Sequence, residues 1–316
     1  MTFLVLAGGL SHERDVSLRS GRRCADALRS AGHEVDVLDA DSALLARLSD
    51  SAAGPRPYRA ALIALHGGAG EDGALRQVLE LTGLPYVGSA PDACRATWDK
   101  PTAKSLAVAA GICTPDSVTL PHATFRELGA AAVLDRIVDR LGLPLMVKPA
   151  RGGSALGCTA VDKADDLPAA MVQCFSYGEA ALIEQLVVGT EVAVTVLDSG
   201  QGPRALPAVE VQPLSGVYDY TARYTAGHTE YFAPARLPGA LAEEVGRVAV
   251  AVHSTLGLRD LSRVDLIVDA EGVVQLLEAN VAPGMTETSL LPMAVECAGL
   301  DLGTVLAELL ERAAAR

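Results

Sequence analysis

The chain has 316 residues, half of them hydrophobic, which is enough for two or three domains with separate cores. Its 39 acidic and 26 basic residues give a formal net charge of −13, which excludes long-range attraction to nucleic acid or to an anionic membrane. No apolar run is long enough to span a bilayer and the N-terminus lacks the features of a signal peptide, so we expect a cytoplasmic protein.

The first hundred residues alternate between strand-like and helix-like segments. Strands are predicted at 3–7, 34–38 and 60–65, and a helix at 16–31. This order predicts a parallel sheet flanked by helices. Gly8 and Gly9 follow the first strand and loosely resemble a dinucleotide-binding turn, but the Gly-x-Gly-x-x-Gly pattern is absent. They are weak evidence for a Rossmann-type oxidoreductase, which remains one alternative.

The composition changes near residue 98, where prolines become frequent. The following segment predicts helices at 102–110 and 125–141 and a strand at 144–148. A third region begins near residue 186, with strands at 191–197 and 208–211, a long loop to Phe232, and helices at 240–256 and 301–314. We therefore expect three domains, at 1–98, 99–185 and 186–316. None of the six cysteines has metal-ligand spacing, so reduced thiols are expected.

A glycine-rich segment begins with Lys148 at the end of the strand at 144–148. Such a loop can wrap its backbone N–H groups around phosphates, although it lacks the Gly-Lys-Ser/Thr order of a Walker A loop. Lys148 and Lys100 are each candidates to neutralise a phosphate, and either one alone is more often a solvated surface lysine. Glu184 and Glu191 are candidates to contact an adenine amine and a ribose hydroxyl.

Two β-rich runs near the C-terminus, 264–268 and 273–277, are separated by a turn sequence and predict a hairpin. Asp265 then lies near Glu278, and Asn280 shares the face of Glu278 because side chains alternate along a strand. Three oxygen ligands without Cys or His suit Mg²⁺, which takes its remaining ligands from water and substrate phosphates. The implied substrate is a nucleotide. The alternative is an edge hairpin with solvated acids.

Motifs along the whole chain resemble those of a known family. They lie at 8–21 (Gly-Gly-Leu-Ser-His-Glu-Arg-Asp-Val-Ser-Leu-Arg-Ser-Gly), 65–73, 84–89, 218–224 and 283–292. Together with the lysines, the glycine-rich loop and the acidic hairpin, they make the chain resemble the D-alanine–D-alanine ligase family of ATP-grasp enzymes. The resemblance implies an α/β fold of three domains, in which an N-terminal parallel α/β domain precedes two α+β domains that sandwich ATP.

The resemblance also implies catalytic roles. Glu13 matches the carboxylate that anchors the ammonium of the first amino acid, with His66 nearby. Arg263 and the Gly284 amide match the groups that polarise the first carboxylate and stabilise the tetrahedral intermediate. Such donors must be held in fixed positions to act.

Further residues match the family's substrate and nucleotide sites. Ser289 and the Leu290 amide match the holder of the second carboxylate, and Ser154 and Tyr224 match the groups that link the loop over the site to Glu13. The remaining matches are the nucleotide residues Lys100, Lys148, Glu184, Glu191 and Arg223, and the metal ligands Asp265, Glu278 and Asn280.

The family's reaction is the ATP-dependent joining of two D-alanine molecules through an acyl phosphate, for peptidoglycan precursor synthesis. It implies ATP and two Mg²⁺ ions, with Mn²⁺ as a substitute and K⁺ as a further candidate. It also implies a homodimer, with small-molecule substrates and no nucleic-acid or membrane partner. No protein nucleophile is required, which agrees with the absence of a convincing Ser/His/Asp or Cys/His motif.

The chain departs from the family pattern at three positions. Gly152 and Ala155 stand where an acidic residue and a second serine are usual, and Arg223 replaces a lysine, which changes a point charge to a planar fork. By resemblance to the family, Tyr224 implies D-alanine as the second substrate. The alternatives are an ATP-grasp amide ligase that couples a different amino acid in specialised metabolism, and a nucleotide-binding regulator without turnover. The intact Arg263 argues against the regulator.

Overall fold

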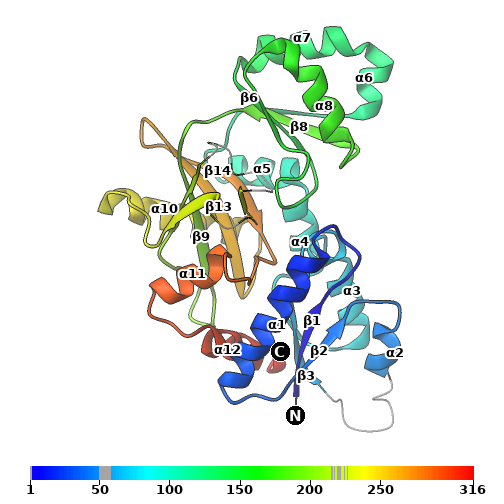
Figure 1. Ribbon diagram of the computed structural model, residues 1–316, viewed down its shortest axis with the longest axis vertical. Helices are drawn as coiled ribbons and strands as arrows, with labels where there is room; N and C mark the ends of the chain where they lie inside the picture. Colours follow the sequence, from blue (N-terminus) through cyan, green and yellow to red (C-terminus); the bar gives the residue numbers. More distant parts are fainter. Residues whose placement is uncertain are drawn as a thin grey trace.

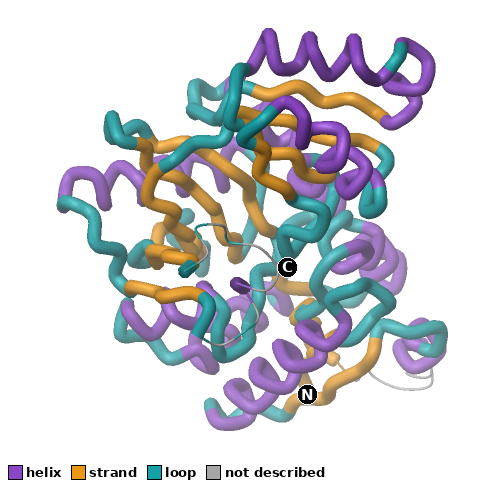
Figure 2. The backbone as a smooth tube through the Cα atoms, turned by 45° about the horizontal axis from the view of Figure 1, so that its top comes forward, coloured by secondary structure: helices purple, strands orange, loops and turns teal. Residues whose placement is uncertain are grey.

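The computed structural model describes residues 2–49, 58–214, 216, 218, 222–223, 225 and 227–316. These residues form three sheets, each flanked by helices (Figure 1). The same chain drawn as a tube shows three groups of strands with helices beside them (Figure 2). The predicted three-part α/β architecture is confirmed by the sheets and by the structural relatives described below. The exact domain boundaries stay a prediction.

The first sheet is parallel, with strand order β2-β1-β3-β4. Its strands are β1 (Thr2–Ala7), β2 (Val35–Asp39), β3 (Tyr58–Ile63) and β4 (Tyr86–Val87), and its helical segments are α1 (Arg14–Ser30), α2 (Leu44–Ser49), η2 (Gly68–Gly70), α3 (Ala74–Thr82) and α4 (Pro91–Trp98). Strands β1 and β3 are almost fully buried, as expected for a parallel sheet covered on both faces. The predicted strands and first helix are confirmed within two residues or so.

The second sheet is antiparallel, with order β5-β8-β6-β7. Its elements are β5 (Ser117–Pro121), α6 (His122–Leu128), α7 (Ala130–Leu141), β6 (Leu145–Pro149), β7 (Thr159–Val161), η3 (Ala164–Asp166), α8 (Leu167–Phe175) and β8 (Ala180–Gln185). The single helix predicted at 125–141 is wrong, because Gly129 adopts φ 87 and divides it into α6 and α7. Glycine reaches this left-handed region without a steric penalty.

The third sheet has six strands, in the order β12-β11-β9-β13-β14 with β10 paired to β9. Its elements are β9 (Gly189–Leu197), β10 (Arg204–Ala205), β11 (Val209–Pro213), β12 (Thr229–Phe232), α10 (Gly239–Thr255), β13 (Leu261–Asp269), β14 (Val274–Asn280), α11 (Leu290–Cys297) and α12 (Leu302–Ala314). Residues 229–232, expected to be loop, pair with β11 as strand β12. Helix α5 (Lys100–Ala109) packs on this sheet through Ala103 and Ala107, beside α10.

The last helix completes the core of the first sheet. Helix α12 packs against α1, β3 and β4, and its buried side chains belong to one cluster with Phe3 and Leu28. Gly303 permits this approach, because a Cβ there would lie 2.3 Å from the carbonyl oxygen of Ala27. Beyond the helix, both terminal nitrogens of the Arg316 guanidinium donate to the fully buried carboxylate of Asp260, each at 2.8 Å. The two ends of the chain therefore share one packed unit.

No single helix among the described residues is long and apolar enough to cross a membrane. Helices α11 and α12 pass the length and composition test only when they are taken together, and they are bent by 104° relative to each other.

Candidate active site

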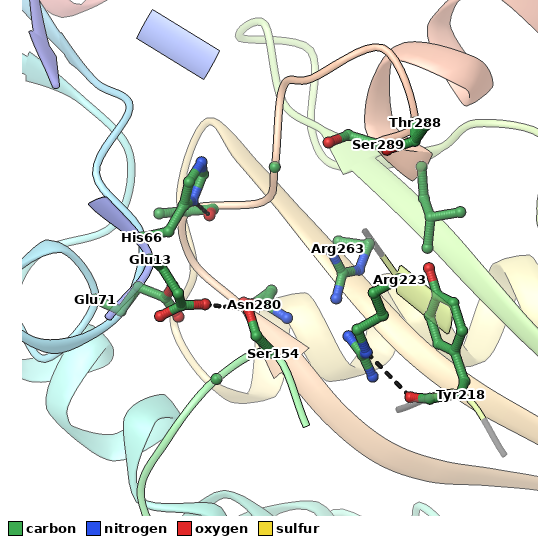
Figure 3. Close-up of a pocket in the computed structure, with 14 residues that line it drawn as sticks. Glu13, His66, Glu71, Ser154, Tyr218, Arg223, Arg263, Asn280, Thr288 and Ser289 are labelled. Carbon is green, nitrogen blue, oxygen red and sulfur yellow. Dashed lines mark hydrogen bonds between the residues drawn. The ribbon is translucent and has the colours of Figure 1, made fainter. Parts of the chain in front are cut away.

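Two neighbouring cavities contain most of the predicted site residues. The smaller, of about 50 Å³, is drawn in Figure 3 and is lined by Glu13, His66, Glu71, Gly153, Ser154, Tyr218, Arg223, Arg263, Asn280, Ala282, Gly284, Thr288, Ser289 and Leu290. The larger, of about 290 Å³, lies between the second and third sheets, and its walls include Lys100, Lys148, Glu184, Glu191, Asp265 and Glu278. The structure thus brings the described candidates together. Tyr224 lies outside the described residues.

Glu13 lies at the start of α1 with its carboxylate in the smaller cavity. Ser154 donates a hydrogen bond to its Oε1 from the glycine-rich loop (Figure 3). Two glycines make room for it, since a Cβ on Gly67 would lie 2.0 Å from Oε2 and one on Gly153 would lie 3.0 Å from Oε1. Burial raises the pKa of Glu13, and the Ser154 hydrogen bond opposes that shift. An ammonium group would satisfy this carboxylate well.

Glu71 is a site residue that the sequence reasoning did not assign, although its motif was noted. Its Oε1 accepts from the Gly67 N–H at 2.8 Å. With the Asn280 amide oriented to suit its neighbours, the Asn280 nitrogen donates to Glu71 Oε2 at 3.2 Å and its oxygen accepts from Arg263 at 2.8 Å. Burial, followed by the nearby charge of Glu13, raises the pKa of Glu71 to about 7. Two buried carboxyl groups that lie this close cannot both ionise freely.

The hairpin of β13 and β14 carries the guanidinium and the proposed metal ligands. Asp265 lies opposite Glu278, close to the place predicted for it, and Arg263 lies opposite Asn280, after a register shift between Asp265 and Leu266. Arg263 donates to both oxygens of Asp265, at 2.7 Å each, because residues two apart share one face of a strand. Although burial lowers the pKa of Arg263, Asp265 raises it above its ordinary value.

Glu278 lies in a concentration of positive charge. The Lys100 ammonium is 3.7 Å from its carboxylate. Burial raises the pKa of Glu278, but Lys100, Arg223 and Lys148 lower it to about 2, so the group is ionised. The oxygen donors of Asp265, Glu278 and Asn280 fit Mg²⁺ in type, although Arg263 occupies two of the three. Among the described residues, no three His, Cys, Asp or Glu side chains already form a metal cluster.

Glu184 is held between two lysines. Lys104 donates to its Oε2 at 2.5 Å and Lys148 pairs with its Oε1, and all three groups are buried. Burial raises the pKa of Glu184, but Lys148 and Lys104 bring it below its ordinary value. Lys104 was missed from the sequence, although its spacing of four residues from Lys100 places both on one face of α5. Lys100 also donates to the Gly152 carbonyl at 2.6 Å.

The glycine-rich loop turns sharply after β6. Ser154 and Ala155 have φ of 53 and 55, and the Leu156 N–H donates to the Gly153 carbonyl at 3.2 Å. Two left-handed residues other than glycine cost about 1–2 kcal/mol each, so contacts with the rest of the protein must hold this turn. The Ser154 hydrogen bond to Glu13 is one such contact.

The wall opposite this loop is formed by aromatic and cationic groups. Arg223 donates to the Tyr218 carbonyl at 3.2 Å, and its guanidinium lies 4.4 Å from the centre of the Tyr218 ring. Glu191 lines the larger cavity, where burial raises its pKa to about 7.

The segment before α11 borders the smaller cavity. The Ser289 hydroxyl accepts from the Thr286 N–H at 2.9 Å. A Cβ on Gly284 would lie 2.7 Å from that hydroxyl, so a larger residue there would displace the Ser289 side chain. Leu290 is the first residue of α11, and its N–H belongs to the free amides of a helix start, which favour negative charge.

Comparison with known proteins agrees with this arrangement. The family model described as "D-ala D-ala ligase C-terminus" matches residues 106–311. A D-alanine–D-alanine ligase of Bordetella petrii is 41% identical over 312 residues, covering 99% of this chain and 92% of its own. One of Anaeromyxobacter dehalogenans is 41% identical over 310 residues, covering 98% and 96%.

Solved structures give the same result. The D-alanine–D-alanine ligase of Bacillus anthracis superposes with a TM-score of 0.81 at 29% identity, covering 99% of this chain and 97% of that one. A D-Ala:D-Ser ligase from Enterococcus faecalis gives 0.82 at 26% identity, covering 99% of both chains. The fold and the two cavities define an ATP-grasp enzyme. Within that class, the chain belongs to the D-alanine–D-alanine ligase family.

Proposed function

We propose that this protein joins two D-alanine molecules to D-alanyl-D-alanine, with ATP converted to ADP and phosphate. The observation that carries the proposal is the convergence of a buried carboxylate, Glu13, and a buried guanidinium, Arg263, in one small cavity. A zwitterionic amino acid offers an ammonium to the first and a carboxylate to the second. The 41% identity to ligases of this name over nearly the whole chain supports the same activity.

The nucleotide is assigned to the larger cavity. Lys100 and Lys148 lie on its wall and would neutralise phosphates. Phosphate binding would draw Lys148 away from Glu184, and Lys104 would keep that carboxylate paired. Glu184 and Glu191 remain the proposed partners of adenine and ribose, with Arg223 near the phosphates.

Asp265, Glu278 and Asn280 would hold Mg²⁺, and the family suggests two ions, with Mn²⁺ as a substitute and K⁺ as a further candidate. Bound Mg²⁺ would offset the charge of the phosphates. Glu278 is ionised and lies opposite Asp265, so its carboxylate is a ready donor, whereas Asp265 would first have to be released by Arg263. We also propose a cytoplasmic homodimer that serves peptidoglycan precursor synthesis, and domains at 1–98, 99–185 and 186–316.

The reaction follows from these positions. A carboxylate oxygen of the first D-alanine attacks the γ-phosphorus of ATP, and ADP leaves. The amine of the second D-alanine then attacks the acyl carbon, loses a proton, and phosphate leaves. Arg263 and the Gly284 N–H would stabilise the oxygen that gains charge at that step. Ser154 would hold the loop closed over Glu13 and exclude water, which would otherwise hydrolyse the acyl phosphate.

The alternative function, a ligase that couples a different amino acid, differs in the acceptor. One structural relative is a D-Ala:D-Ser ligase. The test is phosphate release from Mg²⁺-ATP with D-alanine alone, and with D-alanine plus D-serine, D-lactate or L-alanine, followed by mass analysis. Phosphate release that depends on D-alanine and gives the dipeptide mass is the expected result. A mixed product in preference to the D-alanine dimer would establish a different ligase on the same scaffold.

A further inference from the structure

Helix α1 presents two fully buried serines to the carboxyl ends of the first sheet. Ser17 accepts from the Gly8 N–H and donates to the Ala64 carbonyl, both at 2.8 Å. Ser20, one turn further, lies 2.8 Å from His66 Nε2 and accepts from the Met285 N–H at 3.2 Å. Ser17 joins elements of the first sheet only. Ser20 instead joins that sheet to the segment that contains Gly284.

The hydrogen bonds determine where the proton lies on His66. Its Nδ1 is 3.0 Å from the Ala282 carbonyl, which can only accept, so Nδ1 carries the proton. Burial lowers the pKa of His66 to about 4, so the ring is neutral and Nε2 is an acceptor. Ser20 therefore donates its hydroxyl proton to Nε2 and accepts the Met285 N–H with a lone pair. Both ring nitrogens are committed to protein groups.

These bonds hold the chain on both sides of Gly284. His66 holds the residue two before it, Ala282, and Ser20 holds the residue after it, Met285. Because Ser20 and His66 are also bonded to each other, the two contacts form one bridge across the peptide that presents the Gly284 N–H. Glu13 directly precedes the same helix, so the helical segment between Glu13 and Ser20 sets the separation between the ammonium anchor and this amide.

We propose that Ser20 and His66 form a positioning pair that fixes the direction of the Gly284 N–H for the developing oxyanion. The proposal rests on the function proposed above and adds to it. Ser20 touches no substrate and acts through His66 and Met285. Misdirecting the Gly284 N–H should lower kcat by less than the complete loss of one oxyanion donor does. That complete loss lowers kcat by about 10²–10³.

The chain provides a matched control. Ser20→Ala and Ser17→Ala each remove one hydroxyl with two hydrogen bonds from the same buried helix face, so both should lower stability by a similar amount. We expect Ser20→Ala to lower kcat about 10–100-fold with KM for ATP nearly unchanged, and Ser17→Ala to leave kcat within about threefold. Equal losses of kcat in the two variants, or a change confined to KM, would overturn the proposal.

A double-mutant cycle and one spectroscopic readout complete the test. If the pair acts as a unit, Ser20→Ala combined with His66→Ala should have the kcat of the worse single variant, and additive losses would contradict it. ¹⁵N NMR of the wild-type protein without ligand should show the Nδ1–H tautomer of His66, and the Nε2–H tautomer would overturn the bridge. If the wild type forms no dipeptide, the proposed function fails while the NMR result still tests the bridge.

Discussion

Glu191 makes the stability of the ligand-free protein depend on pH in a direction that can be worked out. Burial raises its pKa from 4.5 to about 7, with Arg223 opposing and Asp265 adding to the shift. A raised carboxyl pKa means that the folded protein binds the proton more tightly than the unfolded chain does. The stability contributed by this proton is complete below pH 4.5 and is lost as the pH rises through about 7. At about 1.4 kcal/mol per unit, the loss is about 3 kcal/mol.

Glu191→Gln should remove this pH-dependent contribution to the free energy of unfolding and keep the shape of the side chain. Denaturant unfolding of the ligand-free protein at about pH 5 and pH 8 measures it, with Glu243→Gln on the exposed face of α10 as the control. We expect the gain in stability from Glu191→Gln to be about 2–3 kcal/mol larger at the higher pH, and no such difference for the control. A gain that is equal at the two pH values would refute the assignment of a protonated Glu191 in the folded protein.

Three further predictions concern the metal site and the packing. Arg263→Met should tighten Mn²⁺ binding to the nucleotide-free protein about tenfold in calorimetry, because the guanidinium occupies the carboxylate that would bind the metal, and unchanged affinity would contradict this. Gly303→Ala should lower the free energy of unfolding by about 1–3 kcal/mol, measured in thermal melts. Gly246→Ala should instead stabilise α10, because the nearest atom is 3.4 Å from the new Cβ. Stability changes of the same sign in the two variants would argue against the packing described. Arg316→Ala should lower the free energy of unfolding by about 1–3 kcal/mol, because the buried Asp260 then keeps, among the described residues, only the Gly88 N–H and Arg259 as partners, and an unchanged stability would count against this contact.

The sequence predicts local features of the fold well where a short-range rule applies. The two β-rich runs predict the hairpin of β13 and β14 and bring Asp265 near Glu278 as expected, whereas the exact pairing depends on a register shift between Asp265 and Leu266 that the turn does not indicate. The prediction of a single helix at 125–141 is wrong because the apolar periodicity of the sequence continues through Gly129. Only the backbone φ of Gly129 shows the break. Strand β12 was missed because the stretch up to Phe232 was read as one loop, and its pairing with β11 joins segments that are separated by many residues.

The site residues that the sequence did not reveal act through distant partners. Lys104 was overlooked because its carboxylate partner, Glu184, is 80 residues away. Ser20 resembles any small helical residue until His66 and Met285 are seen beside it. Glu71 was quoted within a motif, but its raised pKa arises from burial and from Glu13, which no spacing reveals.

The packing of α12 on the first sheet has a consequence for biosynthesis. A ribosome makes residues 2–98 long before residues 302–314, and until then the apolar surface that α12 covers stays open to water. Domains usually fold as units in the order of synthesis, but here the first unit needs the last helix to close its core. The nascent chain therefore exposes this surface from the completion of the first sheet until α12 emerges, an interval in which such a surface favours chaperone binding and aggregation.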